Sequence, residues 1–262
     1  MHKWLYIVLF LYMIMPQFVH SRQIDEQKWE QLNQTTDQIW QYAKQKNFAD
    51  AKQLLHYFSD QWLELTSKHP QLTITEMNIV SLSYDRAYEG VTNDELPIED
   101  RLMRVAELRL VTDAMANDHH PLWLNTKNSI LESIEHLQKY AGASEDEQFL
   151  RQFHQFLKQY QMIRPALLIS LPEGALERLD ALVNEVENRR ANDGYTQVVA
   201  MMYGELEKIF AEEKQNEADA SLLWVMFSIG SMIFVSLFYA GWKKYQGEKQ
   251  KKVMRREMGE DE

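Results

Sequence analysis

Residues 98–117 read IEDRLMRVAELRLVTDAMAN, and this stretch indicates how the chain folds. At about 100° per residue, its apolar side chains fall on one broad face of an α-helix. That face consists of Leu102, Val105, Ala106, Leu110, Ala114 and Ala116. Arg109 and Asp113 lie in its middle, one helical turn apart. We therefore predict that this helix lies at the centre of a bundle and that Arg109 and Asp113 form a buried ion pair.

The segments on both sides also repeat apolar residues at helical spacing. Trp29 to Ala43 and Phe48 to Leu65 predict an antiparallel helical hairpin that turns at Asn47. Further helices are predicted over residues 74–89, 122–141, 145–163, 173–191 and 195–217. We interpret Gly90, Gly142 and Gly194 as helix stops and Ser144 to Glu147 as a capping box. The predicted fold class is all-α, a helical bundle or a short α-solenoid.

The carboxy-terminal part of the chain contains Ser221 to Trp242, twenty-two residues without a charge. A helix of this length crosses the hydrocarbon core of a bilayer. Seven lysines and arginines follow between Lys243 and Arg256, and such a cluster marks the cytoplasmic side of a membrane helix. We therefore predict a transmembrane helix over residues 220–242 and a basic cytoplasmic tail over residues 243–262.

The amino-terminal segment has the layout of a secretory signal peptide. Leu5 to Met15 is an apolar run too short for a comfortable span, preceded by Lys3 and followed by Pro16. Cleavage after Ser21 gives a signal peptide of residues 1–21, and an uncleaved anchor is the alternative. In either case, residues 22–219 are predicted to form an extracytoplasmic helical domain attached to the cell membrane.

Composition excludes several functions. Residues 22–219 carry 34 acidic and 20 basic residues, so this domain repels nucleic acid. The basic tail is instead attracted to the anionic inner leaflet. The chain contains no cysteine, which excludes disulfides, thiolate metal sites and cysteine nucleophiles.

The segment Asp118-His119-His120-Pro121 is the first candidate for chemistry. Together with Asp113, His136 and His154, it offers ligands for a metal site across a bundle. However, neither the Glu-x-x-His nor the His-Glu-x-x-His spacing occurs. Histidines before a proline are also favoured at the carboxy-terminal end of a helix, so we interpret the segment as a helix cap and expect no metal or other cofactor.

Two further patterns have structural interpretations. Phe149, Phe153, Phe156 and Tyr160, with Leu150 and Leu157, have the spacing of a helix face that packs into a core, and a site for an apolar ligand is the alternative. The acidic groups Asp94-Glu95, Glu99-Asp100 and Glu145-Asp146-Glu147 precede or begin predicted helices, where the helix dipole favours anions. Since no nucleophile–base arrangement remains, we predict no enzymatic activity.

Arg101 to Met115, followed by His119-His120-Pro121-Leu122-Trp123, resembles the YpjB-type sporulation proteins of endospore-forming bacilli. The chain is also similar to them in length, signal segment, helical domain, single membrane helix and basic tail. The resemblance implies a sporulation-associated membrane protein and brings no catalytic residues. The candidate binding residues are Arg109, Asp113, His119, His120 and Trp123.

These observations predict a non-enzymatic interaction or scaffold protein that acts on a protein partner through its helical domain. A ligand-binding sensor is the alternative. It needs a signalling partner, because the cytoplasmic tail is too short for an output domain. A metal-dependent hydrolase is the third hypothesis.

Overall fold

The computed structural model describes residues 27–68, 72–117, 120–142, 146–188 and 195–211, together with the helical positions 229, 233 and 244. By its internal contacts, the chain divides into the units Met1–Phe210 and Ala211–Glu262, and the helical domain corresponds to the first. In these described ranges, the regular structure consists of helices and turns without strands. The predicted all-α class is therefore confirmed.

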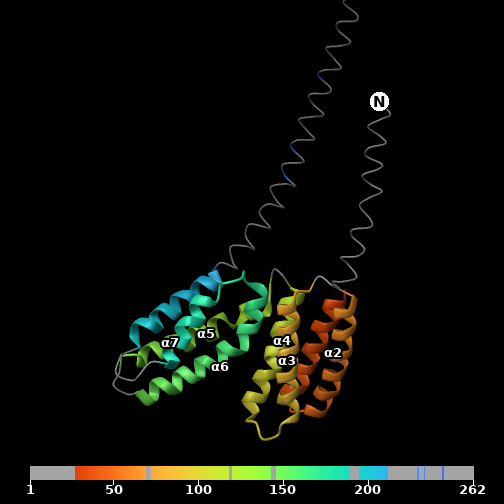
Figure 1. Cartoon of the computed structure of the whole chain (residues 1–262), viewed down its shortest axis with the longest axis horizontal. Helices are drawn as coiled ribbons and strands as arrows, with labels where there is room; N and C mark the ends of the chain where they lie inside the picture. The colour runs from red at the N-terminus through yellow and green to blue at the C-terminus, as the bar shows by residue number, and fades with distance from the viewer. Residues whose placement is uncertain are drawn as a thin grey trace, which may run out of the picture. The chain divides into compact units, whose positions relative to one another are not determined.

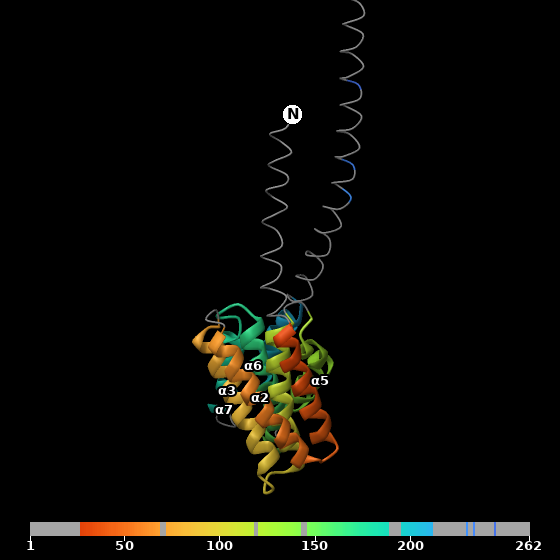
Figure 2. The same cartoon turned by 90° about the vertical axis from the view of Figure 1, so that its right-hand side faces the viewer.

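The domain begins with a helix over residues 27–44, followed by α2 (Phe48–Lys68), α3 (Ile74–Thr92) and α4 (Ile98–Ala116). The 3₁₀-helix η1 (Leu122–Thr126) leads into α5 (Lys127–Tyr140). Helices α6 (Asp146–Ser170) and α7 (Glu177–Asn188) and a helix over residues 196–211 follow. Figure 1 shows α2, α3 and α4 side by side, with α5, α6 and α7 beyond them. In the turned view of Figure 2, α5 and α7 lie on opposite sides of the domain.

The amino-terminal hairpin has the predicted antiparallel arrangement. The rings of Trp29 and Trp62 lie 6.0 Å apart, and Lys28 pairs with Glu64 at 3.1 Å. Asn47 ends the turn because its side chain caps α2, accepting from the backbone amide of Asp50 at 3.4 Å. The predicted interruption at Asn47 is thus a helix cap.

Gly90 was predicted to stop a helix, and this prediction is wrong, since Gly90 lies buried inside α3. A Cβ atom at this position would lie 2.9 Å from the carbonyl oxygen of Arg101 on α4. The missing side chain therefore allows the backbones of α3 and α4 to approach closely. Helix α3 continues to Thr92.

Other helix limits also differ from the predicted ones. Helix α6 runs through Pro165 to Ser170, because the residues after the proline, Ala166 and Leu167, are completely buried and hold this turn against the core. A turn that contains Gly174 at φ 85° precedes α7. The predicted capping box at Ser144 lies outside the described residues, whereas Thr73 and Glu76 form a capping box at the start of α3.

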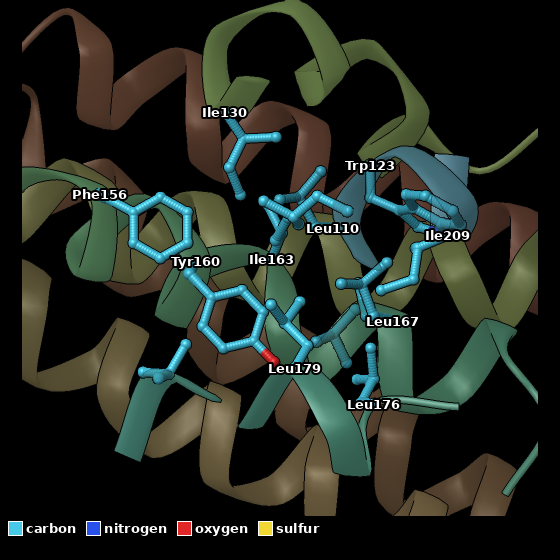
Figure 3. Packing of buried hydrophobic residues seen from close by; sticks show 14 of the residues in the cluster. Leu110, Trp123, Ile130, Phe156, Tyr160, Ile163, Leu167, Leu176, Leu179 and Ile209 are labelled. Carbon is cyan, nitrogen blue, oxygen red and sulfur yellow. The ribbon is translucent and has the colours of Figure 1, made fainter. Parts of the chain in front are cut away.

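The core joins side chains from helices throughout the domain. Leu110 of α4, Ile130 of α5 and Ile163 of α6 converge in Figure 3. Helix α4 is buried on several sides, which confirms its predicted place at the centre. The aromatic stripe from Phe149 to Tyr160 is buried as predicted, although Leu150 is exposed.

None of the helices in the described part of the chain is long and apolar enough to span a bilayer. The predicted membrane helix lies outside the described residues, apart from positions 229 and 233, and the predicted signal peptide lies wholly outside them. Both assignments therefore stay predictions.

The prediction that Arg109 and Asp113 pair with each other is wrong, because each binds other residues. Arg109 pairs with Asp37 on the first helix. Asp113 is 2% exposed, and its carboxylate accepts hydrogen bonds from the side-chain amides of Asn33 at 3.3 Å and Asn117 at 2.6 Å, and from the backbone amide of Leu122. The long arginine side chain reaches a neighbouring helix, while the short carboxylate is enclosed by amide donors.

We expect Asp113→Ala to lower the free energy of unfolding by about 3 kcal/mol, because it leaves buried donors without their charged acceptor. Arg109→Ala should lower it by less than about 1 kcal/mol, because its ion pair with Asp37 is partly exposed. Urea denaturation of both variants measures the difference. Equal losses in the two single variants, restored by an apolar double replacement, would instead support a direct Arg109–Asp113 pair.

Candidate functional site

A groove opens on the face where α3, α6 and α7 surround α4, and its cavity volume is about 560 Å³. Each wall contributes a stripe of residues at helical spacing. From α3 these are Ile79, Leu82, Ser83 and Arg86; from α6, Leu157, Tyr160, Gln161, Arg164, Pro165 and Leu168; from α7, Asp180, Val183, Asn184 and Glu187. Glu107 of α4 also lines the groove and belongs to the central helix. We call this feature the α3/α6 groove.

Glu107 of α4 is the buried carboxylate that binds the α3 wall of the groove. It is 5% exposed and accepts hydrogen bonds from the Ser83 hydroxyl at 2.9 Å and from Nη1 of Arg86 at 3.0 and 3.2 Å. Burial raises the pKa of Glu107, and the charge of Arg86 only partly opposes this shift. The groove thus contains a carboxylate with little access to water and a single arginine partner on α3.

A second cluster joins α6 to α7. The Tyr160 hydroxyl donates to Oδ1 of Asp180 at 2.6 Å, and Arg164 donates to both oxygens of Asp180 at 2.8 and 2.7 Å. Burial opposes ionisation of Asp180, but the hydrogen bonds from Arg164 and Tyr160 outweigh it and lower the pKa of this carboxyl. Burial is the main cause that raises the pKa of Tyr160, and the hydrogen bond to Asp180 raises it further. Asp180 is therefore held as a bidentate partner of Arg164.

A second hollow of about 400 Å³ shares Arg86, Glu107 and Gln161 with the first, so the two are parts of one groove. Its lining includes two ion pairs that cross between helices. Arg104 pairs with Glu89, and Lys158 pairs with Asp100 at 2.6 Å. The groove therefore passes from an apolar end, near Leu82 and Leu168, to an end lined by ion pairs.

Of the candidate binding residues that the structure describes, none is among the residues that line this groove. Arg109 and Asp113 connect α4 to the first helix. Trp123 is completely buried; its indole donates to the Ser170 hydroxyl at 2.9 Å and its ring lies 5.4 Å from that of Phe210. His120 is exposed, and His119 lies outside the described residues. Trp123 and Asp113 are buried and connect elements of the domain through their hydrogen bonds.

The histidines named as possible ligands are separated as well. Nε2 of His136 lies 4.0 Å from Glu132 on the same helix, and the ring of His154 lies 6.4 Å from that of Phe153. Among the described residues, no group of three or more histidines and carboxylates is placed to hold a metal ion. Asp118 and His119 lie outside these residues.

Three members of the acidic groups at the predicted helix starts, Asp94, Asp100 and Glu147, form ion pairs. Asp94 pairs with Arg101 at 3.0 Å, and Glu147 pairs with Arg151 at 2.6 Å. Asp100 pairs with Lys158 across the groove. Glu145 lies outside the described residues.

Sequence reasoning missed most of the groove. Tyr160 was identified as a core residue, but Ser83, Arg86, Glu107, Arg164 and Asp180 were not singled out. Glu107 stands between the apolar residues Ala106 and Leu108, and that position is the one available sign of its burial. The partners of Glu107 and Arg164 are between 16 and 24 residues away in the chain, on other helices, so spacing along a single helix does not reveal them.

A model of the family described as sporulation protein YpjB (SpoYpjB) matches residues 29–254. The chain belongs to this family. It is also 27% identical over 228 residues to the "Uncharacterized protein YpjB" of Bacillus subtilis (strain 168), a match that covers 85% of this chain and 86% of the relative. No solved structure matches the chain.

The family match confirms the resemblance that the sequence indicated. The matched range includes α2 to α7 and therefore the whole α3/α6 groove. It also extends over Ser221 to Trp242 and into the basic tail. The groove thus lies within the region that defines this sporulation family.

Glu107 should give the domain a specific pH dependence. Because its pKa is raised, the folded chain binds more protons than the unfolded chain between the ordinary glutamate value of 4.5 and the raised one. Stability therefore falls as pH rises through this window. Glu107→Gln should remove that fall, so that acidification from pH 7 towards 4.5 stabilises the parent relative to the variant.

Urea denaturation at a series of pH values checks this expectation, with Glu99→Gln on the exposed first turn of α4 as the matched control. Asp180 does not affect this comparison, because its pKa is lowered. Its contribution to stability is lost only as the pH falls below the ordinary aspartate value of 3.8. Parallel stability curves for the parent and Glu107→Gln would contradict the assignment.

Proposed function

We propose that this member of the YpjB family is a non-enzymatic interaction protein of sporulation, anchored in the cell membrane. In this proposal, residues 1–21 are a signal peptide, residues 22–219 lie outside, residues 220–242 cross the membrane and residues 243–262 lie in the cytoplasm. The uncharged run from Ser221 to Trp242 and the basic cluster behind it support this topology.

One observation carries the interaction role: the groups that the groove presents to solvent are suited to binding rather than to reaction. Leu82 and Leu168 are 57% and 41% exposed on opposite walls. The hydroxyls of Ser83 and Tyr160 belong to buried residues and donate to carboxylates that arginines also hold. A catalytic nucleophile or base must instead reach its substrate. The apolar rim and the arginines are what a partner meets.

A ligand-binding sensor is the second candidate, supported by the size of the groove. A volume of about 560 Å³ lies within the usual range of small-molecule pockets, roughly 300–1,000 Å³. Thermal unfolding of the full-length protein against a panel of small ligands tests this candidate. A partner protein would still have to supply the output domain, because the proposed cytoplasmic tail is too short to contain one.

The proposed topology predicts the result of proteolysis. Protease added to intact protoplasts should remove the mass of residues 22–219 while a tag placed after Glu262 stays protected. Permeabilised protoplasts, in which the tag is also lost, serve as the control. A protected helical domain in intact protoplasts would overturn the topology.

The proposed interaction predicts that the rim of the groove is needed in the cell. Leu82→Glu and Leu168→Glu should each leave the free energy of unfolding within about 0.5 kcal/mol of the parent, because both positions are exposed. Each should nevertheless fail to restore sporulation in a deletion strain. Leu63→Glu is the matched control, since Leu63 is exposed on α2 and does not line the groove. Normal sporulation with both groove variants would contradict the proposal.

A further inference from the structure

We infer that the α3/α6 groove binds an amphipathic helix of a partner protein, whose acidic side chain pairs with Arg86 and Arg164. This inference rests on the proposed interaction function and specifies the chemistry of the partner. It follows from the dimensions of the groove, its apolar rim and the exposure of its charged groups.

The groove has the dimensions of a short helix. Its α6 wall extends from Leu157 to Leu168, which at 1.5 Å per residue is about 16 Å, or roughly three helical turns. On α3 the lining runs from Ile79 to Arg86 with the same helical spacing. Stripes of this kind pack against another helix in a bundle, but here both walls face an open space. One further helix completes the arrangement.

The rim supplies the apolar contacts that such a helix requires. Leu82 on α3 and Leu168 on α6 stand on opposite walls, and both are large apolar residues exposed by more than a third. Val183 of α7 lies in the same lining. An apolar stripe on the occupant removes these side chains from water, and this burial is the main driving force for docking.

The larger hollow is lined by two arginines and three carboxylates, Arg86, Arg164, Glu107, Asp180 and Glu187, so the charge that a partner meets depends on how far it can reach each group. The Glu107 side chain is 7% exposed, whereas that of Arg86 is 52% exposed. In the second cluster, Asp180 is 24% exposed and Arg164 is 39% exposed. Both guanidiniums thus lie on the solvent side of their carboxylates. Arg86 donates to Glu107 through Nη1, and Arg164 donates to Asp180 through Nε and Nη2. The other N–H groups are the donors offered to an incoming carboxylate.

This arrangement gives variants with opposite effects. Asp180→Asn and Glu107→Gln remove a competing carboxylate and leave the arginine in place, so each should strengthen binding of an acidic helix. The double variant Arg86→Gln/Glu107→Gln removes the cation without leaving a buried charge alone, so it should fold and bind more weakly. A partner with a basic residue at this position would reverse both effects.

The test uses the purified full-length chain in phosphatidylcholine nanodiscs and stapled helical peptides of about three turns. Each peptide has leucines at i, i+3, i+4 and i+7 and carries two glutamates, two glutamines or two lysines beside the leucine stripe. Fluorescence anisotropy should show that the glutamate peptide binds at least about tenfold more tightly than the lysine peptide. Asp180→Asn should increase this ratio, and Arg86→Gln/Glu107→Gln should reduce it, because only Arg164 is left to pair with the glutamates. Empty nanodiscs and Leu63→Glu are the controls.

Three results would overturn the inference. Equal or tighter binding of the lysine peptide would exclude an acidic partner at the arginines. If decanoate displaces the bound glutamate peptide at a lower concentration than added glutamate peptide does, the groove is a site for a small amphipathic anion. Absence of peptide binding, combined with loss of sporulation in Leu82→Glu, would exclude the helix while leaving the proposed function intact. Circular dichroism of the double variant checks that it is folded.

Discussion

The fold depends on one constraint: the charged side chains that α4 buries in the domain need partners from other parts of the chain. Arg101 of α4 donates to the carbonyl oxygens at the end of α3, at 2.7 and 3.0 Å. Glu107 takes its partners from α3, and Arg109 takes its partner from the first helix. Asp113 binds the first helix and η1. An uncompensated charge in this interior is costly, so these pairings determine which elements lie beside α4.

The groove is a consequence of that arrangement. Helices α3 and α6 both pack along α4, but they meet each other at few positions. Side chains on their facing stripes therefore line an open space instead of interdigitating. Glu107 extends into this space from the central helix, so one residue both positions α3 through Arg86 and forms part of the candidate binding surface.

The charges in the groove are mixed, and those that reach solvent include two arginines. Residues 22–219 carry a large excess of acidic side chains, which repels anionic partners from most of the surface. The described lining of the groove contains the cations Arg86, Arg104, Lys158 and Arg164 and the carboxylates Glu89, Asp100, Glu107, Asp180 and Glu187. The attraction for an acidic group is therefore local to the exposed guanidiniums of Arg86 and Arg164 and does not come from a net positive charge of the groove. Attachment to a membrane would keep a partner that carries such a group at a high local concentration.

The spacing of apolar residues was enough to predict the all-α class, the hairpin around Asn47, the central place of residues 98–117 and the buried aromatic stripe. These features depend on periodicity along one helix, which is a local property. Packing between helices established that Asp113 binds amides while Arg109 binds Asp37, that Gly90 permits close packing, and that Pro165 lies within a helix. The groove belongs to the second group, because its polar clusters join α3 to α4 and α6 to α7. Such contacts depend on how helices pack, and the spacing of residues within a helix does not specify their partners.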